Sequence, residues 1–97
     1  MKITNETKRK IKKQIVNRIQ KLRSLAHDYM NDGDGKSEAD CYAQVDEIRR
    51  TIRFLGFETK AYAGGIDRVC GLTIEIVAHK WANWEKAVTE LGLNVNI

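Results

Sequence analysis

The cationic side chains near the amino terminus are the groups in this sequence best suited to bind a ligand. Five of the six residues 8–13 are Lys or Arg, and residues 1–27 hold nine such cations against one acid, Glu6. Residues 28–97 carry a net charge of −4, since the whole chain carries +4. Clustered cations attract phosphates, and their binding releases counterions from nucleic acid. The pattern indicates an acidic partner, either a phosphate backbone or a carboxylate-rich protein surface.

Arginines further along the chain form a second cationic group. Arginine suits bidentate recognition of phosphate or carboxylate better than lysine does, because its guanidinium presents a planar fork of donors. Asp46 lies four residues before Arg50, a spacing at which an ion pair on a helix satisfies one of these arginines. The candidate contact residues of both groups are Lys12, Lys13, Arg18, Lys21, Arg49, Arg50 and Arg53.

A solvated helix face, charged only for solubility, is the alternative interpretation of the amino-terminal cations. No aromatic residue interleaves with the lysines of this first segment. Stacking on single-stranded bases is therefore not supported by that segment.

The acidic residues around the Asp32-Gly33-Asp34-Gly35 stretch suggest a calcium loop, but the spacing of an EF-hand fails. With Asp32 as the first ligand, Ser37 stands where a glycine is required and Ala43 stands where the closing glutamate is required. Helix capping and loop solubility account for these acids. We expect no metal site and no cofactor.

One tripeptide, Glu58-Thr59-Lys60, matches the acid-x-lysine element of some metal-dependent nucleases. Such a site also needs an acid from a neighbouring strand to help hold the metal that activates water. The nearest preceding acids, Asp46 and Glu47, fall on a predicted helix. Neither histidine of the chain has a Ser or Cys at a recognisable spacing for nucleophilic catalysis. We expect no enzymatic activity, with a small nuclease as a remote alternative.

Apolar periodicity predicts two helices that place these cations. Apolar residues recur three or four positions apart from about Thr4 to Asn31, with Thr4 or Asn5 as the cap, and again in a helix that Ser37 opens. A five-residue connection between them favours an antiparallel helical hairpin. Gly56 is expected to end the second helix as its left-handed residue.

The apolar period then changes to two, which predicts strands over 57–63 and 70–78 joined at Gly64-Gly65. A third helix is expected from about Lys80, with Trp81 and Trp84 on its inner face. Residues 93–97 alternate and are a candidate third strand, which would make 72–97 a parallel βαβ unit. The predicted fold is a single α+β domain over 1–97, with a helical hairpin (1–56) and a ββα(β) part (57–97).

Composition sets further expectations. Cys41 and Cys70 occupy apolar positions, as buried free thiols in a reducing cytoplasm do. No apolar run approaches the roughly 20 residues of a membrane span, and no secretory signal opens the chain. We expect a cytoplasmic protein. So small a body is also expected to leave part of its long helix or a sheet edge uncovered, which favours a homodimer.

In general character the chain resembles the small accessory proteins of bacteriophages and mobile elements, including inhibitors of CRISPR nucleases. The likeness lies in the short length, the opening Lys8-Arg9-Lys10-Ile11-Lys12-Lys13 and an acidic body, and it involves no motif. It implies either binding to nucleic acid or blocking a larger nucleic-acid enzyme. We expect a non-enzymatic protein that engages nucleic acid, or a nucleic-acid-handling protein complex, through its basic helical surface. The alternative is a phage or mobile-element inhibitor of a host nuclease that acts by protein–protein contact.

Overall fold

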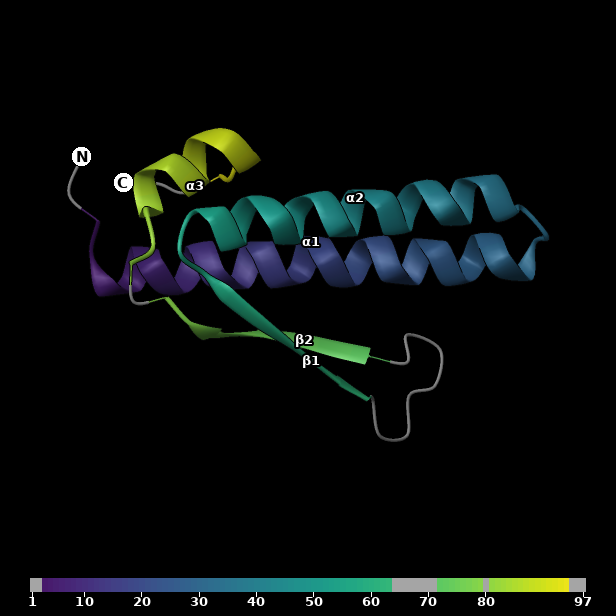
Figure 1. Ribbon diagram of the computed structural model, residues 1–97, viewed down its shortest axis with the longest axis horizontal. Helices are drawn as coiled ribbons and strands as arrows, with labels where there is room; N and C mark the ends of the chain where they lie inside the picture. The colour runs from purple at the N-terminus through teal and green to yellow at the C-terminus, as the bar shows by residue number, and fades with distance from the viewer. Residues whose placement is uncertain (1–2, 64–71, 80, 95–97) are drawn as a thin grey trace.

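Three helices and two strands make up the part of the chain that the computed structural model describes, residues 3–63, 72–79 and 81–94. The elements are α1 (Asn5–Asn31), α2 (Gly35–Phe54), β1 (Glu58–Ala63), β2 (Leu72–Ala78) and α3 (Trp84–Leu91). Figure 1 shows them in this order along the chain. The predicted α+β class and the order helix, helix, strand, strand, helix are confirmed.

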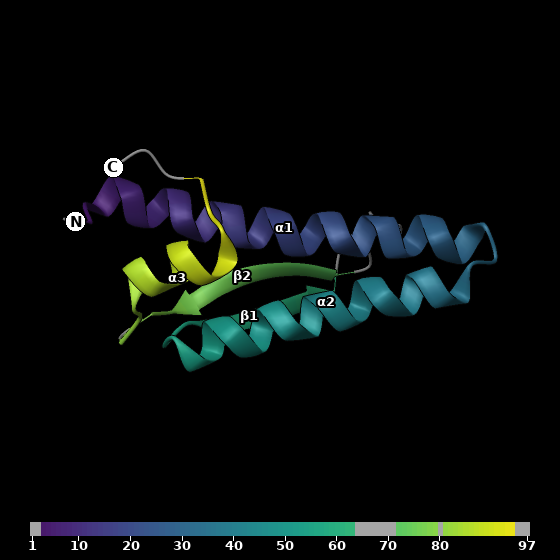
Figure 2. The ribbon, with the colours of Figure 1, turned by 90° about the horizontal axis from the view of Figure 1, so that it is seen from above.

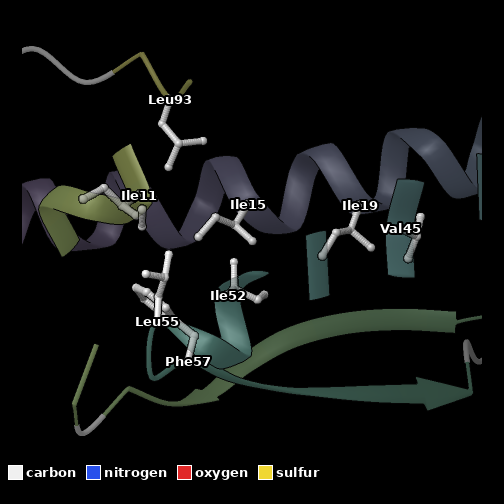
Figure 3. Close-up of a cluster of buried hydrophobic side chains, with 9 residues drawn as sticks. Ile11, Ile15, Ile19, Val45, Ile52, Leu55, Phe57 and Leu93 are labelled. Carbon is white, nitrogen blue, oxygen red and sulfur yellow. The ribbon is translucent and has the colours of Figure 1, made fainter. Parts of the chain in front are cut away.

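The two long helices lie antiparallel, side by side, along the longest dimension of the molecule (Figures 1 and 2). Their apolar stripes meet in the core, where Ile11 and Ile15 of α1 face Leu55 and Ile52, at the end of α2 (Figure 3). These side chains are buried, and removal of each from water contributes about 1.5–3 kcal/mol. The start of α1 is therefore held beside the end of α2.

The sheet and α3 cover opposite faces of this hairpin (Figures 1 and 2). β1 and β2 pair antiparallel, with Thr59 opposite Ile76, and Ile76 packs against the core. Phe57, just before β1, is fully buried, and its ring packs edge to face with the Trp84 ring at a centroid distance of 4.9 Å. One hydrophobic core thus joins both helices of the hairpin, the start of the sheet and α3.

Each helix is followed, one or two residues after its last residue, by a glycine with a positive φ: Gly33, Gly56 and Gly92. At the end of α2, Phe57 N–H donates to the Ile52 carbonyl at 2.8 Å and Gly56 N–H donates to the Arg53 carbonyl at 3.0 Å. This pair of bonds is the Schellman motif, which needs a residue with positive φ. The predicted role of Gly56, whose φ is 96°, is confirmed.

The second helix begins earlier than predicted, at Gly35, so the expectation that Ser37 opens it is wrong. Asp34 is the N-cap: its Oδ1 accepts from Ser37 N–H at 3.1 Å and its Oδ2 accepts from the Ser37 hydroxyl at 2.7 Å. Asp is a preferred N-cap residue, and its bond to the third residue of the helix brings Gly35 into the first turn.

The third helix begins later than predicted, at Trp84 and not near Lys80, because Asn83 caps it by accepting a bond from Lys86 N–H at 3.0 Å. Trp84 is half-buried against the core as expected. Trp81 precedes the helix and is 80% exposed, so its predicted place on the inner face is wrong.

The candidate third strand is not seen where the structure describes it. Leu93 and Asn94 lie in no strand, and residues 95–97 fall outside the described residues. The sheet of the described part has two antiparallel strands, without the parallel pair that a βαβ unit requires.

Candidate functional site

The antiparallel hairpin brings the two cationic groups of the sequence to one end of the molecule. Residues 8–13 occupy the first turns of α1, and residues 49–53 lie within the last two turns of α2. Figure 1 shows the start of α1 and the end of α2 together at the left of the view. We call these residues, 8–13 and 49–53, the basic end.

The opposite end of the hairpin is acidic. The turn between α1 and α2 and the helical turns beside it carry five acids: Asp28, Asp32, Asp34, Glu38 and Asp40. The molecule is 46 Å long and 26 Å by 23 Å across, so most of its length separates the two groups. Charge is therefore distributed unevenly along the molecule, with a cluster of cations at one end and a cluster of acids at the other.

Five of the eight cationic side chains of the basic end are exposed to solvent, and Lys8, Lys12 and Arg49 are half-buried. Lys13, Arg50 and Arg53 are among the exposed ones. Lys10 Nζ lies 3.8 Å from Glu6 Oε1, an exposed pair whose strength in water is small. Within residues 3–63, 72–79 and 81–94, none of the other seven cations of the basic end forms an ion pair. The ion pair between Asp46 and Arg50 considered from their spacing is thus not formed.

Arg49 faces the sheet, where its Nε donates to Thr59 Oγ1 at 3.3 Å. Close to it is Arg23 of α1, whose Nε and Nη1 are buried without a hydrogen-bond partner in the part of the chain described. Burial lowers the pKa of Arg23, and the positive charge of Arg49 lowers it further, while Tyr42 and Asp46 act in the opposite direction. Arg23, which the sequence did not single out, is therefore held in an unfavourable environment for its charge.

Arg18 and Lys21 lie apart from the other predicted contact residues. The Arg18 guanidinium donates to the Leu91 carbonyl at the end of α3. One turn earlier, Gln14 Nε2 donates to the Asn94 carbonyl at 2.7 Å, and Gln14 Oε1 accepts from Asn94 N–H at 3.0 Å. Arg18 thus holds the end of α3, and Gln14 holds the chain that follows it; the charge of Arg18 alone does not predict this structural role.

A groove between α1 and α2 is lined in part by Arg18. Its volume is about 690 Å³, and its apolar lining includes Leu22, Leu25 and Ile48, with Lys21 at its margin. Leu25 is 37% exposed. The predicted residues therefore divide between this groove, with Arg18 and Lys21, and the basic end.

Phe54 is the residue of the basic end region that the sequence interpretation missed. Its side chain is 84% exposed, and it lines a hollow of about 570 Å³ with Arg50, Thr51, Arg53 and Glu90. A neighbouring hollow of about 320 Å³ shares Arg50 and Arg53. The signal was present in the sequence, because Phe54 falls off the apolar stripe of α2 formed by Cys41, Val45, Ile48, Ile52 and Leu55.

The described structure brings together no metal-binding group around the acids of the turn or around the nuclease-like tripeptide Glu58-Thr59-Lys60. No group of three or more His, Cys, Asp or Glu side chains is placed to hold a metal among the residues described. Glu58 and Lys60 are exposed on β1, and the register sets Lys60 opposite Glu75 of β2. An acid does therefore occupy the neighbouring strand, which the sequence argument overlooked. Cys41 is buried as a free thiol, as predicted, and Cys70 lies outside the described residues.

Comparisons of the chain with protein-family models, with curated proteins and with solved structures give no match. No helix in the described ranges has both the length and the apolar character needed to cross a bilayer.

Proposed function

We propose that this protein is a non-enzymatic nucleic-acid-binding protein that holds a phosphate backbone against its basic end. The observation that carries the proposal is the accessibility of these cations. Lys13, Arg50 and Arg53 project into solvent without ion pairs in the described structure, while five acids lie at and beside the far turn.

Phosphate binding needs little beyond this arrangement. A cation that meets a phosphate releases condensed counterions, and each such contact adds to affinity without any base-specific geometry. Both helices of the hairpin, α1 and α2, present cations at the basic end, so both can contact one phosphate backbone. The acidic end favours an approach in which the basic end faces the polyanion.

The test measures binding to a generic DNA duplex as a function of salt. The logarithm of the association constant is expected to fall linearly with the logarithm of the salt concentration. Lys12→Ala with Lys13→Ala should lower the steepness of that line by about 2, one for each lost phosphate contact.

A matched control removes the same kind of charge elsewhere. Lys13→Ala and Lys36→Ala each delete one exposed lysine, but Lys36 lies in the first turn of α2, at the acidic end. Only Lys13→Ala should change the salt dependence. Equal effects of the two variants, or no binding to either duplex or single-stranded DNA by the unaltered protein, would contradict the proposal.

A second candidate function is protein–protein contact, as in a phage or mobile-element inhibitor of a nuclease. The groove of about 690 Å³ between α1 and α2 favours it, because its apolar lining and the cation of Lys21 suit a partner helix with an apolar face and an acidic margin. The unaltered protein should then keep its protein partner after nuclease treatment. Leu25→Asp should lose that partner while its affinity for DNA stays unchanged. Loss of DNA binding in the same variant would count against a separate protein-binding groove.

A further inference from the structure

We propose that Phe54, which lines one hollow with Arg50 and Arg53, is a stacking site for an unpaired base, so that the preferred nucleic acid is single-stranded. The inference rests on the proposed function and names its substrate class.

The position of Phe54 is unusual for a phenylalanine. Phe57, three residues later, is fully buried, whereas Phe54 keeps 84% of its surface exposed although it lies in the last turn of a packed helix. Its neighbours at the surface are Arg50, one turn earlier on the helix, and Arg53. No ring contact or cation–π contact of Phe54 occurs among the described residues, so the ring faces are open to a ligand.

Two hollows share Arg50 and Arg53. The hollow of about 570 Å³ is lined by Phe54, both arginines, Thr51 and one acid, Glu90. The adjoining one of about 320 Å³ extends along α2 to Asp46 and Arg49. Such a surface has room for a base against the ring and for the flanking phosphates against the guanidinium groups.

Charge and shape together favour unpaired nucleotides. A cationic groove with an exposed aromatic ring is the arrangement by which proteins bind single strands, because every base offers a flat face for stacking. In a duplex these faces are covered by neighbouring base pairs, and a side chain reaches them only by unstacking a step. A phosphate backbone alone would not use the Phe54 ring.

The experiment compares a fluorescent oligothymidylate of about 15 nucleotides with a duplex of the same length, by anisotropy at one salt concentration. The unaltered protein is expected to bind the single strand more tightly. Phe54→Ala should weaken single-strand binding by about 5- to 150-fold, the loss of one stacked base, and leave duplex binding within about two-fold. Phe54→Tyr should retain the single-strand affinity because it keeps a stacking face.

Met30→Ala is the matched control, since Met30 is an apolar side chain, 50% exposed, at the acidic end. It should leave both affinities unchanged. If the protein binds duplex in a salt-dependent way and Phe54→Ala does not alter its single-strand affinity, the stacking site is overturned and the proposed function stands. Absence of binding to either polymer would overturn both. A protein dimer that dissociates on Phe54→Ala, with single-strand affinity unchanged, would assign the ring to a contact between copies and also overturn the stacking site.

Discussion

Arg18 and Arg50 carry the same charge in the same hairpin, but their nitrogens meet different groups. Arg18 donates to the Leu91 carbonyl and so stabilises the end of α3. Arg50 is exposed and lines two hollows without an ion pair in the described structure. Charge and spacing in the sequence give both residues the same candidate role. The groups around each guanidinium show the difference: Arg18 serves the fold, whereas Arg50 is available to a ligand.

Arg23 is predicted to destabilise the folded protein. Its Nε and Nη1 are buried without a partner in the described part, and Arg49 repels it. Arg23→Met keeps an aliphatic stem of similar length and removes the buried donors, so the free energy of unfolding should rise by about 1 kcal/mol. Urea denaturation measures this change. Arg9→Met, at an exposed position of the same helix, should leave stability unaltered, and a less stable Arg23→Met variant would contradict the argument.

Asp34 is predicted to make the stability of α2 depend on pH. Hydrogen bonds from the Ser37 hydroxyl and N–H lower the pKa of Asp34 below its ordinary value of 3.8. Since the folded-state pKa is the lower one, the ionised cap stabilises fully above pH 3.8, and the stabilisation is lost as the pH falls through the folded-state value.

Asp34→Asn keeps an acceptor at the cap and removes the titration. Thermal unfolding followed from neutral pH into the acid range should therefore show a steeper decline for the unaltered protein than for Asp34→Asn. Parallel declines would mean that the cap does not contribute to acid sensitivity.

At the scale of elements, the sequence predicted the presence of the helices from apolar periodicity and their ends from glycine. The stripe of Ile11, Ile15 and Ile19 predicted α1, and Gly56 and Gly92 mark the ends of α2 and α3 in the structure. The starts of α2 and α3 were misplaced because each depends on a side chain capping a backbone N–H three residues later, and several neighbouring polar residues were able to do so. The exposure of Trp81 could not be predicted from helical periodicity, because Trp81 lies before the start of α3 at Trp84.

Gly56 joins the end of α2 to the segment before α3, and its replacement should be costly. A Cβ at this position would lie 2.6 Å from both the Trp81 carbonyl carbon and its oxygen, and the backbone has φ 96°. Gly56→Ala is expected to lower the free energy of unfolding by about 2–4 kcal/mol, from backbone strain and overpacking together.

Gly33→Ala separates the two contributions. Gly33 also has a positive φ, 75°, but no atom lies within 4 Å of a Cβ built there. Only the strain remains, so the loss should be about 1–2 kcal/mol. Urea denaturation of both variants checks the difference, and equal losses would show that the contact with Trp81 does not limit this position.

At the scale of the whole molecule, the candidate site arises from pairing two segments about 40 residues apart. The lysines of α1 and the arginines of α2 were both visible in the sequence, and the predicted hairpin was sufficient to bring them to one end. The sequence did not reveal which of these cations the fold itself uses. Arg18 contacts α3 and Arg49 contacts β1, and periodicity does not determine where those elements are placed. The exposure of Phe54 was predictable from its position off the apolar stripe of α2, but it was missed.

The separation of charge along 46 Å predicts a salt-dependent influence of the acidic end. Asp28→Asn with Asp32→Asn neutralises two exposed acids near the far turn and raises the net charge by two units. The Debye length is about 8 Å at 0.15 M salt and about 30 Å at 0.01 M. Nucleic-acid affinity should therefore stay within about two-fold at the higher salt and rise clearly only at the lower one. Lys12→Ala with Lys13→Ala should weaken binding at both, because in the proposed binding mode these lysines touch the phosphates. A gain from the acid variant that is the same at both salt concentrations would mean that the acidic end lies next to the ligand, and would contradict binding through the basic end.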